Sequence, residues 1–102
     1  MKVYIAGKIT GDRGYRDKFK AVEKKLVEEG YTPMNPAVLP DGFDYEEYMR
    51  VCFAMLDTCE GVCLLWDHGE SPGAKRELSK ARRDNKRLFI IDEDHMEIKE
   101  LS

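Results

Sequence analysis

Residues 61–81 read GVCLLWDHGESPGAKRELSKA, and this stretch decides the fold. The continuous apolar run over residues 61–66 is typical of a strand that is covered on both faces. Ser71 is a good helix N-cap and Pro72 suits the first helical position, so a helix begins there. A buried strand that runs through one loop into a helix favours an α/β fold with a parallel sheet.

The same alternation extends along the rest of the chain. Strands are predicted at residues 2–6, 31–34, 61–66 and 87–91, and helices at residues 15–29, at residues 44–58 and after Ser71. Right-handed crossovers between such strands give a small three-layer α/β sandwich, Rossmann-like, with about four parallel strands. The 102 residues suffice for one domain with one core. Residues 92–102 are expected to form an acidic tail with at most one short helix.

Composition narrows the possible partners. The chain is 42% apolar and carries a net charge of −3, and no apolar run approaches the length that a bilayer requires. The start MKVYIAG lacks the features of a secretory signal, so a cytoplasmic protein without membrane insertion is expected. A negative net charge gives no electrostatic basis for binding a nucleic acid, although residues 75–87 are locally basic. That basic segment is expected to be a solvated helix face.

Metal sites and disulfides are not expected either. The three cysteines lie in apolar surroundings without a CxxC pair, which favours buried free thiols. His95 stands alone among tail carboxylates, where a histidine is usually solvated. The helix over residues 44–58 has an apolar face too broad for a single sheet contact, and this predicts a homodimer or a larger homo-oligomer.

Two loops are expected to leave strands at the carboxyl edge of the sheet, where ligands of open α/β folds bind. The first, residues 7–14 (GKITGDRG), has glycines that let backbone N–H groups turn toward an anion. Its side-chain donors are Lys8, Thr10 and Arg13. The alternative interpretation is a tight glycine turn with solvated cations.

The second loop runs into the helix at Pro72 and places Glu77 at the margin of the face that packs on the sheet. Gly73 leaves room for a ligand to approach the backbone. Burial raises a carboxylate's pKa while a helix N-terminus and nearby donors lower it, so an ionised but poorly hydrated nucleophile is expected. The alternative is a surface glutamate that pairs with Lys80 or Arg76.

Four sequence motifs, in order and with a helix and a strand between them, carry a family resemblance. VYIAGKITG at residues 3–11, a helix, MNPAVLP at 34–40, YEEYMR at 45–50, an apolar strand and SPGAKRELSKA at 71–81 resemble the nucleoside 2-deoxyribosyltransferase-like superfamily. The chain looks most like its small phage and bacterial members and is more distantly similar to the deoxynucleoside monophosphate N-glycosidases. The resemblance covers residues 1–91 and implies a flavodoxin-like, usually oligomeric protein that cleaves an N-glycosidic bond through a glutamate nucleophile.

The resemblance assigns roles to individual residues. Glu77 takes the place of the nucleophile, and Tyr4 helps to position it. Ser71 and Gly73 match one side of the substrate cradle. The loop that holds the sugar and, in the monophosphate hydrolases, the 5′-phosphate corresponds to Gly7, Ile9, Thr10, Gly11 and Arg13.

Two departures from the relatives bear on activity. Lys8 stands where proline is common and could strengthen phosphate binding, while Cys52 lies in a segment where relatives carry an aspartate near the leaving base. Asp67 could supply the acid for that base, or it could simply bind loop amides at the strand end. No cofactor is expected, because the sugar ring oxygen stabilises the developing charge. The alternative to an enzyme is a non-catalytic nucleotide-binding module.

Overall fold

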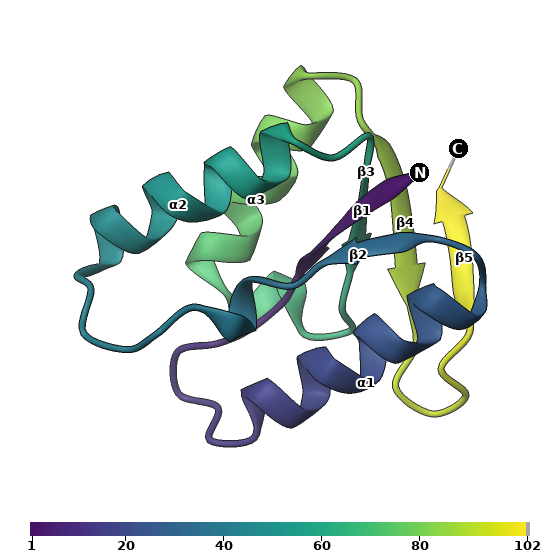
Figure 1. Ribbon diagram of the computed structural model, residues 1–102, viewed down its shortest axis with the longest axis horizontal. Coiled ribbons are helices and arrows are strands. Elements are labelled where there is room, and N and C mark those ends of the chain that lie inside the picture. The colour runs from purple at the N-terminus through teal and green to yellow at the C-terminus, as the bar shows by residue number, and fades with distance from the viewer. Residues whose placement is uncertain (102) are drawn as a thin grey trace.

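The chain forms five short strands in this computed structural model, which describes residues 1–101 (Figure 1). The strands are β1 (Lys2–Ala6), β2 (Thr32–Met34), β3 (Gly61–Leu64), β4 (Arg87–Ile91) and β5 (Ile98–Leu101). The sheet has the order β2-β1-β3-β4-β5. The pairings from β2 through β4 are all parallel, and β5 runs antiparallel to β4. The predicted α/β class and its four parallel strands are therefore confirmed.

Helices cover both faces of this sheet. On one face, α1 (Tyr15–Glu28) buries Phe19, Val22 and Leu26. On the other face lie α2 (Tyr45–Asp57) and α3 (Pro72–Arg83), as Figure 1 shows. Every side chain of β3 is buried, as expected for a strand between two helical layers. The result is the expected three-layer sandwich.

The helices α2 and α3 begin directly after the predicted N-cap residues. Asp44 accepts a hydrogen bond from the backbone N–H of Glu47, whose own carboxylate accepts from the N–H of Asp44, so the pair forms a capping box before α2. The Ser71 hydroxyl accepts a hydrogen bond from the N–H of Ala74 at 3.1 Å, and Pro72 is the first residue of α3. Local sequence thus fixes where α3 begins, and α3 carries Glu77.

The expectation of an acidic tail with at most a short helix is wrong. A turn at Met96, which has a φ of 52°, returns the chain so that β5 pairs with β4. The carboxylate of Asp92 closes this turn by accepting hydrogen bonds from the N–H groups of His95 and Glu97. Ile98 packs against the core on the α1 face, which gives the hairpin an apolar anchor. The last residue of the predicted tail, Ser102, lies outside the described residues.

The parallel register brings the predicted loops together. Ala6 pairs with Leu64, and the N–H of Leu65 donates to the carbonyl of Ala6 at 2.8 Å. The loop after β1 and the connection from β3 to α3 therefore leave the sheet at one edge. Two short 3₁₀ helices, η1 (Pro36–Val38) and η2 (His68–Glu70), lie in the connections near that edge. Within residues 1–101, no helix combines the length and apolar character needed to cross a membrane.

Candidate functional site

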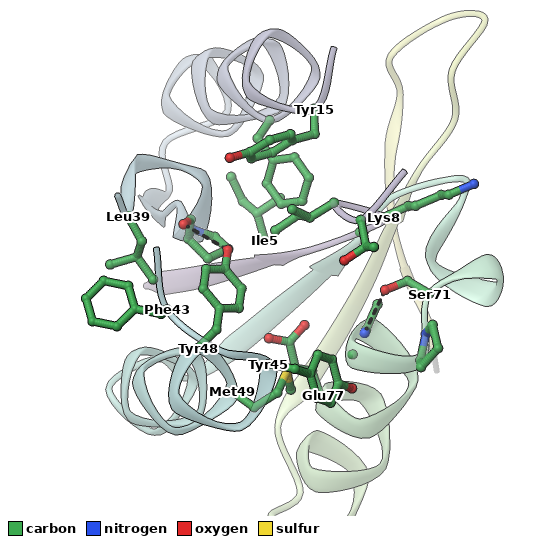
Figure 2. A pocket seen from close by; sticks show the side chains of 18 of the residues that line it. Ile5, Lys8, Tyr15, Leu39, Phe43, Tyr45, Tyr48, Met49, Ser71 and Glu77 are labelled. Atoms are coloured by element: carbon green, nitrogen blue, oxygen red, sulfur yellow. Dashed lines mark hydrogen bonds between the residues drawn. The ribbon is translucent and has the colours of Figure 1, made fainter. Parts of the chain in front are cut away.

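A cavity of about 450 Å³ lies at the edge where these loops meet. Small-molecule sites commonly measure about 300–1,000 Å³, so this cavity can hold one small ligand. Its walls come from β1 and the loop after it, from α1, from the connection between β2 and α2, and from the first turns of α2 and α3. Figure 2 shows Tyr15 on one side of the cavity and Glu77 on the opposite side.

Glu77 lines the cavity and is only 5% exposed. The hydroxyl of Tyr4, itself fully buried on β1, donates a short hydrogen bond to its Oε2. The predicted pair of nucleophile and positioning tyrosine is therefore in contact. The alternative of a surface glutamate is wrong, because the carboxyl is buried and Lys80 and Arg76 form their ion pairs with other carboxylates.

Burial raises the pKa of Glu77 to about 8, and this effect outweighs the hydrogen bond from Tyr4 and the charge of Arg76, which lower it. The carboxyl is therefore mainly protonated at neutral pH, which corrects the expectation of an ionised group. Arg76 compensates little because its guanidinium forms an ion pair with Glu46, at 2.9 Å. The pKa of the Tyr4 hydroxyl is raised well above its ordinary value by burial and by the neighbouring Glu77.

The loop after β1 contributes four predicted residues to the cavity, namely Gly7, Lys8, Ile9 and Thr10. Gly11 and Arg13 were also predicted, but they lie outside the cavity lining and are exposed. Gly11 has a φ of 83°, a conformation that suits glycine and turns the chain back toward α1. Gly7 is needed for packing, because an added Cβ would lie 2.7 Å from Cδ2 of Leu65.

Asp67 holds this loop in place and does not line the cavity. Its Oδ1 accepts a hydrogen bond from the N–H of Lys8 at 3.0 Å, and its Oδ2 lies 2.6 Å from Nζ of Lys18. Both carboxylate oxygens are therefore engaged behind the loop. This position matches the alternative interpretation, a strand-end residue that binds loop amides, and a role for Asp67 as leaving-group acid stays a prediction.

The start of α3 borders the same end of the cavity as the loop after β1. Ser71 and Gly73 line the cavity as predicted. The hydroxyl of Ser71 accepts from the N–H of Ala74 and so caps α3. The N–H of Gly73, in the first turn, has no acceptor within the helix. Across the rim, Nζ of Lys8 pairs with the exposed Glu70 at 3.6 Å. This end of the cavity is therefore polar and offers several hydrogen-bond donors.

Aromatic side chains that sequence reasoning did not assign to the site line the other end. Phe43 and Tyr48 project there from the segment before α2 and from α2, together with Leu39, whereas Tyr45 and Met49 lie against Gly73 at the start of α3. The hydroxyl of Tyr48 donates to the carbonyl of Pro36 at 3.2 Å, which fixes its ring (Figure 2). The one sequence signal for this wall is the width of the apolar face predicted for residues 44–58.

Cys52 lies beneath this wall and is 1% exposed. Burial raises the pKa of its thiol to about 11, so the group stays protonated. It does not line the cavity. The other two cysteines are buried and unpaired as well, which confirms the prediction of free thiols. Within residues 1–101, His, Cys, Asp and Glu side chains form no cluster of three that could hold a metal ion.

A family model matches most of the chain. The family model described as Domain of unknown function (DUF4406) matches residues 1–90. Those residues include all the side chains that line the cavity, whereas β5 lies beyond them. No curated protein matches the chain.

Proposed function

This chain belongs to the DUF4406 family, a family of unknown function, and we propose that it cleaves or transfers the N-glycosidic bond of a (deoxy)nucleoside or nucleoside 5′-monophosphate. Glu77 is the nucleophile. The observation that carries the proposal is the burial of this carboxyl, 5% exposed and bonded to Tyr4, in a cavity of ligand size. A carboxyl is rarely buried without a cationic partner, and a catalytic task accounts for this one.

The order of groups around the cavity supports a nucleotide ligand. Figure 2 shows Lys8 and Ser71 at one end, Leu39 and Phe43 at the other, and Glu77 between them. A nucleotide has the same order, with a polar 5′ group, a sugar and a flat base. Aromatic rings suit the base because they stack on its face. In this orientation C1′ of the sugar faces Glu77.

In the proposed reaction, an ionised oxygen of Glu77 attacks C1′ and forms an ester with the sugar. The bond from C1′ to the base nitrogen breaks, and its electron pair leaves on the base, which takes up a proton. Water then hydrolyses the ester, or a nitrogen of a second base attacks C1′ and displaces the carboxylate. The sugar ring oxygen stabilises the positive charge that develops at C1′, so the residues of the cavity need no cofactor.

Protonation of Glu77 sets the pH range of this reaction. With a pKa of about 8, roughly one tenth of the carboxyl is ionised at pH 7. The positive charge that develops on the sugar favours the ionised form in the transition state. Tyr4 occupies Oε2, which leaves Oε1 as the attacking oxygen.

A second candidate is a nucleotide-binding module without catalysis. Asp67 accepts hydrogen bonds from the N–H of Lys8 and from Nζ of Lys18, and this favours the binding module. With Asp67 occupied in this way, no second buried carboxyl among the described residues is available to protonate the leaving base. Asp41 and Glu70 line the cavity, but their side chains are 84% and 68% exposed. A neutral Glu77 could act in such a module as a hydrogen-bond donor to the ligand.

A panel of deoxynucleosides and their 5′-monophosphates separates the two candidates. Free base is measured by chromatography, and the shift in melting temperature is measured in the same samples. Base release from at least one compound supports the enzyme. A raised melting temperature without base release supports the binding module. If neither appears for any compound, both proposals fail.

The proposed partner, beyond the ligand, is a second copy of this chain. Val51 and Tyr45 on α2 are 40% and 46% exposed, and Val38 and Phe43 in the connection before α2 are 71% and 53% exposed. Large apolar side chains left exposed on one connected segment favour an interface. Light scattering of the wild type and of Val51→Lys tests this, and a monomeric wild type would contradict it.

A further inference from the structure

Lys18 on α1 is the centre of a partly buried charged cluster at the loop after β1. Its Nζ donates to the carbonyl of Lys8 at 2.8 Å and to Oδ2 of Asp67 at 2.6 Å, and it also binds Asp12. The side chain of Lys18 is only 10% exposed. One ammonium therefore joins the loop to the end of β3.

Lys18 touches the cavity only through other residues. Neither Lys18 nor its two carboxylate partners line the cavity, whereas Lys8, whose carbonyl it binds, does. The backbone of Lys8 is held on both sides, because its N–H donates to Asp67 at 3.0 Å. Any shift of this cluster therefore moves residues 7–10, which form one wall of the cavity.

The opposite wall of the cavity, which includes Leu39, is held to the same helix by weaker contacts. Arg16 donates from Nε to the carbonyl of Ala37 and from Nη2 to the carbonyl of Leu39, both at 3.2 Å. Its side chain is 50% exposed, and its ion pair with the exposed Asp41 spans 3.4 Å. Exposed contacts of this kind contribute little, whereas the ion pair between Lys18 and Asp67, whose side chains are 10% and 11% exposed, is shielded from water and stronger. The wall at residues 7–10 is therefore the more rigid of the two.

We propose that Lys18 is a positioning residue of this site, which holds residues 7–10 in the shape that receives the ligand. For the identity of that ligand the inference rests on the proposed function, but the positioning itself can be measured in the free protein. A preformed wall lowers the entropy that binding costs, so loss of Lys18 should weaken binding more than it slows the bond-breaking step.

Hydrogen exchange of the free protein, measured by NMR, tests the positioning directly. In Lys18→Met, the amide of Lys8, which donates to Asp67, and the amides of Asp12 and Gly14, which donate within the loop, should exchange about tenfold faster or more. The amides of Ala37 and Leu39 in the opposite wall and those of β3 and β4 should change little after correction for global stability.

Two variants on the same helix serve as matched controls. Lys20→Met removes an exposed lysine and should leave both walls unchanged. Arg16→Met should speed exchange at Ala37 and Leu39 while sparing Lys8. The inference is overturned if Lys18→Met leaves the loop amides protected, or if it speeds exchange evenly through the whole domain.

Removing Lys18 alone leaves two carboxylates without their cation, which can prevent folding. The variant Lys18→Met/Asp67→Asn removes one of these charges and keeps an oxygen that can accept from the N–H of Lys8. This double variant should fold and should still show faster exchange at Asp12 and Gly14. Lys18→Arg restores the charge and should restore protection in part. Full protection of the loop in the double variant would overturn the inference.

The effect on turnover is measured with the four common 2′-deoxynucleoside 5′-monophosphates. For a compound that releases base, the double variant should raise KM about tenfold while changing kcat less than threefold, since Lys18 does not contact the reacting atoms. A fall in kcat with KM unchanged would contradict the positioning role. If the wild type releases no base from any compound, the proposed enzymatic function fails, and hydrogen exchange still decides the role of Lys18.

Discussion

The hydroxyl of Tyr4 on β1 donates a hydrogen bond to Oε2 of Glu77 on α3, although 73 residues separate the two in the chain. Both side chains are buried, and both line the cavity. A buried carboxyl normally destabilises a protein unless its polar atoms are satisfied. The tyrosine satisfies one oxygen, and the protonated state avoids the cost of a buried charge. The protonation state of Glu77 in this pair therefore affects both the stability of the fold and the pH dependence of the proposed reaction.

Replacing Glu77 with glutamine should abolish base release. Glutamine has nearly the same shape but cannot form the glycosyl ester, so the rate should fall by about 10³-fold or more. The melting temperature should stay close to that of the wild type, since Tyr4 can still donate to the amide oxygen. Base release is measured by chromatography, with Glu28→Gln on the exposed face of α1 as the control. A Glu77→Gln variant that keeps the wild-type rate contradicts the assignment.

Deprotonation of Glu77 should lower the free energy of unfolding as the pH rises. Its pKa is about 8 when folded and near the ordinary 4.5 when unfolded, so between these values the folded state binds more protons. The stabilising contribution is complete below pH 4.5 and is lost as the pH rises through about 8. Urea unfolding from pH 5 to pH 8 should show a loss of a few kcal/mol, on the order of 1 kcal/mol per pH unit.

The variant Glu77→Gln isolates this contribution, because it has no proton to lose. The free energy of unfolding of the wild type, minus that of the variant, should decrease steadily over this range and level off above it. A difference that stays constant with pH would show that the carboxyl does not titrate there.

Replacing Tyr4 with phenylalanine should move the pH profile of activity to higher pH. The hydrogen bond from Tyr4 lowers the pKa of Glu77, so its loss leaves burial less opposed and raises that pKa further. At pH 7 the ionised fraction and the rate should both fall, by about tenfold or more. The profile of kcat/KM is measured between pH 6 and 10, and the rate of the variant should recover in part at the alkaline end. An unshifted profile argues against coupling of the two groups.

Local patterns in the sequence predicted the fold and half of the site. The cap at Ser71 and the proline after it placed the start of α3, and the spacing to Glu77 then followed. The glycines after β1 predicted a loop at the correct edge of the sheet. Such features depend on neighbours within a few residues, which is why a single sequence reveals them. The pairing of β5 was missed because the hairpin is short and rich in charge.

The rest of the site depends on contacts between distant segments. Lys18 looks like a solvated residue on a charged helix face, and only the folded chain brings it to Asp67, 49 residues away. The aromatic wall around Phe43 depends on how the irregular segment before α2 turns back over the sheet. The pKa of Glu77 was misjudged for the same reason, since burial from all sides outweighs its local helix environment.

Replacing Gly7 with alanine should destabilise the protein and weaken ligand binding together. The new Cβ would lie 2.7 Å from Cδ2 and 2.9 Å from Cβ of Leu65, so either the loop or this core side chain must shift. Overpacking of this kind typically costs about 1–3 kcal/mol. Gly69→Ala is the control, because an added Cβ there meets no atom within 4 Å. Urea unfolding of the two variants should differ by that amount, and equal stabilities would mean that the loop moves away from Leu65 without cost.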